Sequence, residues 1–169
     1  SPLTFLFSGI LEKTIKNESK KLITYFYKQD IPVPTYLIAF ACGDLEYGKL
    51  SERCGVYTER GLIEKALYEF AETEELLQTA ENFIDKYVWG VYNILVLPFA
   101  FPYGGMENPC LTFVTPALLA GDRSMTNVIA HEIAHSWTGN LVTNKNWNNF
   151  WMNEGFTKFV ERKIFYKNF

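Results

Sequence analysis

The segment SMTNVIAHEIAHSWTGN occupies residues 124–140 and contains both histidines of the chain. Its apolar residues recur at helical spacing and Gly139 supplies a C-terminal stop, so we predict a helix that begins near Ser124. His131 and His135 are four residues apart, which places both imidazoles on one face of that helix. Two ring nitrogens can therefore reach the same ion.

Glu132 follows the first histidine directly, which gives the pattern H-E-x-x-H. Imidazole nitrogen suits zinc at about 2.0–2.2 Å, and we predict that His131 and His135 are zinc ligands. Glu132 would face the open position on the metal and accept a proton from bound water. The alternative is a chance arrangement of surface histidines, but the chain has only 2 histidines, and chance seldom gives them this spacing.

A third ligand is expected at Glu154, on a following helix, with 18 residues between it and His135. Three nitrogen and oxygen ligands leave a fourth position for water, whereas structural zinc sites are usually closed by four protein ligands. The pattern therefore predicts a catalytic site with one zinc ion. Taken alone, Glu154 would instead be a solvated carboxylate favoured by the helix dipole.

Glu161 lies seven residues beyond Glu154 and so on the same helical face. A carboxylate in that place can accept the second N–H of a ligand histidine and raise its basicity. Pairing with Lys158 or Lys163 on the solvated face explains Glu161 equally well.

Away from this motif, the chain changes its hydrophobic period near Arg60. Before that point the pattern favours strands, and after it helices alternate with short apolar runs. We therefore predict an α+β fold with a boundary between residues 1–58 and 59–169. The expected strands are Leu3–Phe7, Leu22–Tyr27, Tyr36–Ala41, Ile94–Leu97 and Leu111–Val114.

Two further helices are expected in the second part. One long amphipathic helix should run from Leu62 to Ile84. Another should cover about Asn149 to Tyr166. Its residues predicted to face a core are Phe156, Phe159, Val160 and Ile164.

The stretch FPYGGMENP at residues 101–109 is flanked by prolines and contains paired glycines. These features exclude a central strand but suit an exposed sheet edge. A plain surface turn is the alternative reading of the glycines alone.

Composition limits the partners. The net charge of -3 combines 16 basic with 19 acidic residues, which argues against nucleic acid or a membrane surface as the main partner. No apolar run reaches the roughly 18 residues of a membrane helix. The 3 cysteines form no C-x-x-C pair, so a reducing compartment, the cytoplasm, fits best.

The order of these motifs resembles the gluzincin aminopeptidases of the aminopeptidase N family. That family has H-E-x-x-H, then 18 residues, then E, with G-x-M-E-N upstream, here residues 104–108. The sequences of residues 101–116 and 135–144 are similar to those of the branch that contains leukotriene A(4) hydrolase and aminopeptidase B. Thr138 and Lys145 favour a hydrolase-like member, and Phe156 favours aminopeptidase B; of the two, the resemblance favours the hydrolase-like member.

The resemblance implies a zinc aminopeptidase that releases N-terminal residues from peptides with a free N-terminus. It implies the end of a β-rich N-terminal domain at residues 1–58, then the first part of a thermolysin-like catalytic domain at 59–169. Glu107 would bind the substrate α-amine on an edge strand, where glycines allow close approach. The residues expected to bind substrate are Pro102, Tyr103, Gly104, Gly105, Met106, Glu107 and Asn108.

Other readings stay open. The family also uses a tyrosine downstream of the third ligand, beyond Phe169, so we expect the chain to turn over little in isolation. The parent protein could be bifunctional and also open a lipid epoxide. It could instead be a non-catalytic protein that binds zinc or a partner.

Overall fold

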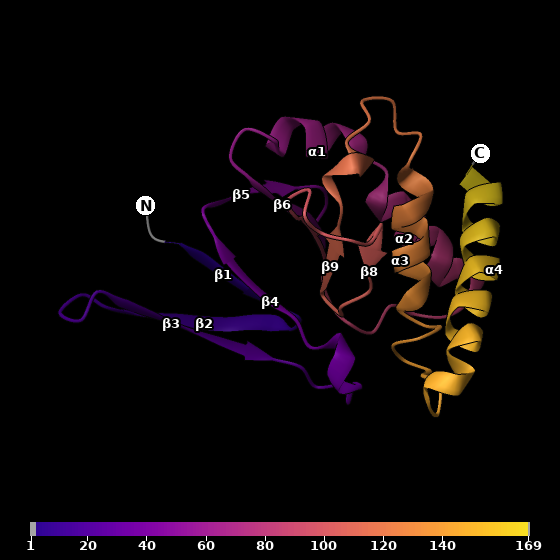
Figure 1. Cartoon of the computed structure of the whole chain (residues 1–169), viewed down its shortest axis with the longest axis horizontal. Coiled ribbons are helices and arrows are strands. Elements are labelled where there is room, and N and C mark those ends of the chain that lie inside the picture. Colours follow the sequence, from indigo (N-terminus) through magenta and orange to yellow (C-terminus); the bar gives the residue numbers. More distant parts are fainter. Residues whose placement is uncertain (1–2, 169) are drawn as a thin grey trace.

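The computed structural model describes residues 3–168 and combines strands with helices, which confirms the predicted α+β class (Figure 1). The strands are β1 (Thr4–Phe7), β2 (Ile10–Asn17), β3 (Leu22–Lys28), β4 (Phe40–Gly43), β5 (Leu45–Lys49), β6 (Cys54–Glu59), β7 (Tyr92–Val96), β8 (Gly105–Met106) and β9 (Leu111–Val114). The helices are α1 (Ile63–Glu69), α2 (Thr73–Phe83), α3 (Thr126–His135) and α4 (Phe150–Asn168), with short 3-10 turns at Thr35–Leu37, Pro116–Leu118 and Trp147–Asn149.

A five-stranded sheet in the order β5-β6-β7-β9-β8 forms the centre of the molecule. The predicted apolar runs became β7 and β9, which pair in parallel through Ile94↔Thr112 and Leu95↔Phe113. β8 pairs antiparallel with β9 and lies at the end of the sheet. The prediction of an edge strand within residues 101–109 is therefore confirmed.

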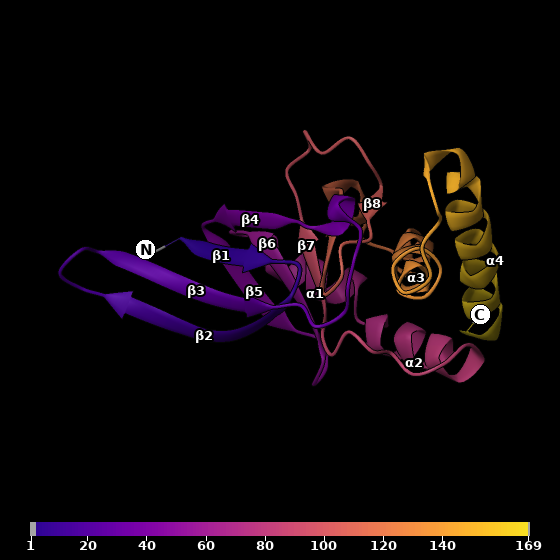
Figure 2. The same ribbon diagram turned by 90° about the horizontal axis from the view of Figure 1, so that it is seen from below.

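The strands within residues 4–43 pair only with one another. β1 pairs with β4, and β2 pairs with β3 in a hairpin that projects away from the central sheet (Figures 1 and 2). The pattern missed β2, whose side chains are all exposed. The predicted strand Tyr36–Ala41 was wrong at its start, because Pro34 leads into a 3-10 turn that buries Leu37, and the strand begins only at Phe40.

The predicted boundary between residues 58 and 59 falls inside the five-stranded sheet. The boundary cuts the last residue from β6, and β6 pairs in parallel with β7, which lies after the boundary, from Cys54↔Tyr92 to Tyr57↔Leu95. Where one domain ends and the next begins therefore stays a prediction about the parent protein.

The single long helix predicted from Leu62 to Ile84 was wrong, because the structure has α1 and α2 with a break at residues 70–72. The Thr73 hydroxyl and the Thr73 N–H both donate to the Phe70 carbonyl, at 2.7 and 3.0 Å. This local bonding replaces the helical pattern and starts a new helix axis. Phe70 is itself buried in the core.

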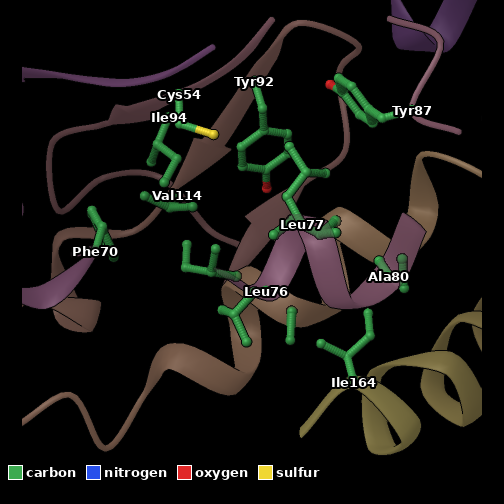
Figure 3. Packing of buried hydrophobic residues seen from close by; sticks show 14 of the residues in the cluster. Cys54, Phe70, Leu76, Leu77, Ala80, Tyr87, Tyr92, Ile94, Val114 and Ile164 are labelled. Atoms are coloured by element: carbon green, nitrogen blue, oxygen red, sulfur yellow. The ribbon is translucent and has the colours of Figure 1, made fainter. Parts of the chain in front are cut away.

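The core lies between the sheet and helices α2, α3 and α4, which gather on the side away from the hairpin (Figure 2). Figure 3 shows Leu77 and Ala80 of α2 packed between the strand residue Ile94 and Ile164 of α4. No helix within residues 3–168 has the length and apolar character needed to span a bilayer.

Only half of the predicted inner face of α4 is correct. Val160 and Ile164 are buried, whereas Phe156 and Phe159 are 60% and 55% exposed. The buried face is completed instead by polar residues, which hydrophobic spacing cannot identify. These residues are Asn153, Thr157 and Glu161.

Candidate metal centre

Helix α3 presents two histidines side by side. One face of the helix is apolar and buried; it consists of Ile129, Ala130, Ile133 and Ala134. The rings of His131 and His135 stand edge to face, with centroids 4.7 Å apart.

Helix α4 brings Glu154 opposite the two rings. Its Oε2 lies 3.3 Å from Nε2 of His131, and its Oε1 lies 3.5 Å from Nε2 of His135. One potential ligand atom from each of the three residues lies within 4.8 Å of the others. The structure therefore brings together the three residues that the sequence nominated as metal ligands.

The remaining ring nitrogens have oxygen partners. Nδ1 of His131 is 2.9 Å from Oε2 of Glu161, and Nδ1 of His135 is 3.0 Å from the Thr138 carbonyl. Carboxylate and carbonyl oxygens accept hydrogen bonds, so each Nδ1 can donate its proton there and leave the lone pair of Nε2 for a metal. Two lone pairs and a carboxylate that face one another need a cation between them. This donor set fits a divalent metal ion.

The pKa shifts of these groups also indicate that the site favours a positive charge. Contacts with His131 and His135 hold the pKa of Glu154 well below its usual range. Burial is the largest single influence and opposes the charged form of both histidines, but the contact with Glu154 and the other nearby carboxylates together outweigh it and raise the pKa of each ring. Without a metal, protons would take the place of the ion.

Glu132 lies beside the three residues but turns toward the sheet edge. It is only 4% exposed, and its Oε2 has no hydrogen-bond partner among residues 3–168. Burial raises its pKa to about 8, helped by the charges of Glu107, Glu154 and Glu161 and opposed by His131. An unpartnered buried carboxylate with a raised pKa is typical of a catalytic acid or base.

Strand β8 lies directly against Glu132. A side chain at Gly105 would overlap the Glu132 carboxylate, so only glycine permits this approach. The next residue but one, Glu107, is buried, and the Asn140 side chain holds its backbone carbonyl at 2.7 Å. Ligand atoms of Glu107, Glu132 and His135 also lie within 4.8 Å of one another.

An open cleft of about 330 Å³ runs between β8, α3 and α4. This volume is within the range of ordinary ligand pockets. Its lining contains four glutamates, both histidines and one lysine. The lining residues are Gly104, Gly105, Glu107, Asn127, Val128, His131, Glu132, His135, Glu154, Lys158 and Glu161.

Four of the residues expected to bind substrate lie outside that lining. Tyr103 is 63% exposed and packs against Phe101, and the Asn108 side chain donates to the Leu37 carbonyl at 3.0 Å. Pro102 and Met106 also do not line the cleft. A substrate role for these four stays a prediction.

The sequence pattern did not identify two polar residues of the site, Asn127 and Thr157, and left the partner of a third, Glu161, undecided. Asn127 lines the cleft, and Thr157 contacts Nδ1 of His135 at 3.0 Å. Each lies one helical turn from a predicted ligand, so helical spacing could have nominated both. For Glu161 the two competing expectations are both present, since it contacts His131 and Lys158 together.

Comparison with known proteins gives consistent matches. Residues 68–169 match the family model described as the peptidase family M1 domain. The chain is 58% identical to leukotriene A-4 hydrolase of Xenopus laevis over 153 residues, which are 90% of the chain and 25% of that protein. It is 55% identical to aminopeptidase B of Mus musculus over 141 residues, 83% of the chain and 22% of that protein.

A solved structure of yeast LTA4 hydrolase in complex with bestatin superposes with a TM-score of 0.89 at 50% identity. The match covers 97% of this chain and 25% of the yeast chain. The chain thus spans about a quarter of the length of the proteins that it resembles.

Proposed function

Because the chain belongs to peptidase family M1, we propose that its parent protein is a zinc-dependent aminopeptidase that releases N-terminal residues from peptides. The observation that carries the proposal is the convergence of the Nε2 atoms of His131 and His135 and the Glu154 carboxylate, with Glu132 beside them.

Zinc is the ion that this donor set suits best. Two imidazole nitrogens and one carboxylate, without cysteine, are typical of catalytic zinc sites that keep a position open for water or substrate. When bound, such an ion lowers the pKa of its water to about 7 and polarises the substrate carbonyl. We assign the three ligands to His131, His135 and Glu154.

Glu132 is proposed as the general base. It accepts a proton from the attacking water and later delivers it to the leaving amine. The raised pKa of Glu132 reflects a site without a cation. A positive ion nearby favours the charged carboxylate, so Glu132 should be ionised when the metal is present.

Glu107 and β8 are proposed to orient the peptide. β8 is a sheet edge, so an extended substrate can pair with its backbone, and Gly105 leaves room beside Glu132. A buried carboxylate at Glu107 would bind the protonated α-amine of the substrate. Cleavage would then be restricted to the chain end.

Hydrolysis of a lipid epoxide is a second candidate, since the Xenopus laevis relative is named leukotriene A-4 hydrolase. The same cleft and the same metal would serve that reaction. Assays of the full-length parent on aminoacyl arylamides and on leukotriene A-4, each with and without a chelator, separate the two activities.

Further proposals concern the parent protein. We place the end of a β-rich N-terminal domain at residues 1–58 and the start of the catalytic domain at 59–169. We also propose a cytoplasmic protein that binds neither nucleic acid nor membranes. Unpaired thiols at Cys42, Cys54 and Cys110 and the net charge of -3 support this proposal.

The decisive experiment is Glu132→Gln in the full-length parent. The variant should keep its zinc, measured by metal analysis, and lose about 10²- to 10⁴-fold or more in turnover, because only the proton acceptor is removed. Retention of full activity would refute the role of Glu132. Loss of zinc from the variant would instead assign Glu132 to metal binding.

A further inference from the structure

Lys158 is the only lysine or arginine among the described residues that line the cleft, where four glutamates gather. Its side chain is 51% exposed, yet its ammonium is not free in the cleft. Nζ lies 2.7 Å from both oxygens of Glu161.

The Glu161 carboxylate is shared between two positively polarised groups. Its Oε2 contacts both the Lys158 ammonium, at 2.7 Å, and Nδ1 of His131, at 2.9 Å. The Asn127 amide reaches the other oxygen at 3.5 Å. Glu161 itself is only 2% exposed, so little solvent screens the interaction of its charge with either partner.

The second histidine is supported differently. Nδ1 of His135 contacts the Thr138 carbonyl and the Thr157 hydroxyl, each at 3.0 Å, and both groups are neutral. The two ligand histidines thus differ in the charge behind them. Only the support of His131 includes a side chain whose charge another residue can offset.

We propose that Lys158 lowers the metal affinity of the site by acting on His131 through Glu161. A carboxylate that accepts the N–H of a ligand histidine raises the basicity of that ligand and tightens metal binding. An ammonium on the same oxygen withdraws charge from the carboxylate and weakens this effect. Lys158 is thus a positioning and tuning residue rather than a ligand, and the inference rests on the proposed metal site.

The test is zinc affinity, measured by competition with a chromophoric chelator, for wild type, Lys158→Met, Lys158→Arg and Lys163→Met. Lys158→Met should bind zinc about 3- to 10-fold more tightly, less than the 10- to 100-fold typical of losing such a carboxylate altogether. Lys158→Arg keeps the charge and should match wild type. Lys163→Met removes the same charge from the same helix, where Lys163 lies over the Phe159 ring, and should also match.

A double-mutant cycle with Glu161→Gln tests the route. Because Lys158 acts through Glu161, the Lys158→Met change should alter zinc affinity less than about twofold in the Glu161→Gln background. A full effect in that background would overturn the route through Glu161. Unchanged or weaker zinc binding by Lys158→Met alone would overturn the proposal itself.

The wild-type titration separates this inference from the function on which it rests. If wild type binds no zinc, both the proposed function and this inference fail. If wild type binds zinc and the lysine variants do not differ, only the role of Lys158 fails. Far-UV circular dichroism of each variant shows that it is folded before its affinity is compared.

Discussion

Glutamates cluster in two regions of this molecule, and the regions differ in whether a lysine or arginine neutralises their charges. Beside α2, Arg53 lies 2.9 Å from Glu74 and also contacts Glu81, so a cation serves both acids. In the cleft, Glu107 and Glu132 have no lysine or arginine contact among the described residues. The first region balances its charges within the fold, whereas among the described residues of the cleft only Glu161 has a lysine partner.

The pKa values express this difference. Burial alone would raise the pKa of Glu74, but hydrogen bonds from Arg53, Ser51 and Gln78 lower it to about 2. The pKa of Glu132, which is buried near other acids, rises to about 8. Paired charges therefore contribute to stability, whereas unpaired charges near two histidines create a place for an added cation.

The largest contrast should come from Glu107→Gln, assayed as hydrolysis of an aminoacyl arylamide by the parent protein. Loss of a charged partner for the substrate amine should reduce kcat/KM about a hundredfold. The free energy of unfolding should stay the same or rise, because no cation loses its partner in the free protein. A variant that unfolds more easily but keeps its activity would reverse the assignment of the cleft.

The matching change beside α2 is Glu74→Gln, and it should affect stability rather than activity. The folded-state pKa of Glu74 lies below its usual 4.5, so its stabilising effect is complete above about pH 4.5 and is lost as the pH falls toward 2. Urea unfolding should show wild type about 2 kcal/mol more stable than the variant at pH 7. The difference should shrink steadily from pH 4.5 to pH 2.5.

Zinc affinity and kcat/KM of Glu74→Gln should equal those of wild type at pH 7. A pH-independent stability difference would show that Arg53 does not depend on the Glu74 charge. A loss of zinc would show that the two regions are coupled.

A smaller effect is expected from replacing two glycines with alanine, because Gly105 lies against a residue of the cleft and Gly155 does not. Gly105→Ala should overlap the Glu132 carboxylate and reduce turnover about tenfold with little change in fold. Gly155→Ala meets no atom within 4 Å in α4 and should stabilise the protein by about 0.5–1 kcal/mol with turnover unchanged. Equal turnover in the two variants would show that β8 does not need to lie so close to Glu132.

Local spacing predicted the parts of the site that lie on one helix. His131, Glu132 and His135 are set by helical geometry alone, and β7 and β9 were evident as apolar runs between turn residues. The shared role of Glu161 could not be read from spacing. Lys158 lies three residues before Glu161 on α4, but only the packing of α3 against α4 brings His131 to the same carboxylate.

The errors arose where local hydrogen bonds or burial in the folded chain override the hydrophobic pattern. The break between α1 and α2 depends on Thr73 bonding to Phe70, and the turn before β4 depends on burial of Leu37. The exposure of Phe156 and Phe159 follows because Thr157 and Glu161 occupy the inner face of α4 as partners of the histidines. The hydrophobic pattern alone cannot identify those partners.

The most direct test is a crystal structure of the protein grown with zinc, with anomalous diffraction recorded at the zinc edge. We expect one strong peak about 2.0–2.2 Å from Nε2 of His131, Nε2 of His135 and a carboxylate oxygen of Glu154. A peak held instead by Glu107, Glu132 and His135, the other group of ligands in the cleft, or a Glu154 side chain turned away from the ion, would contradict the account.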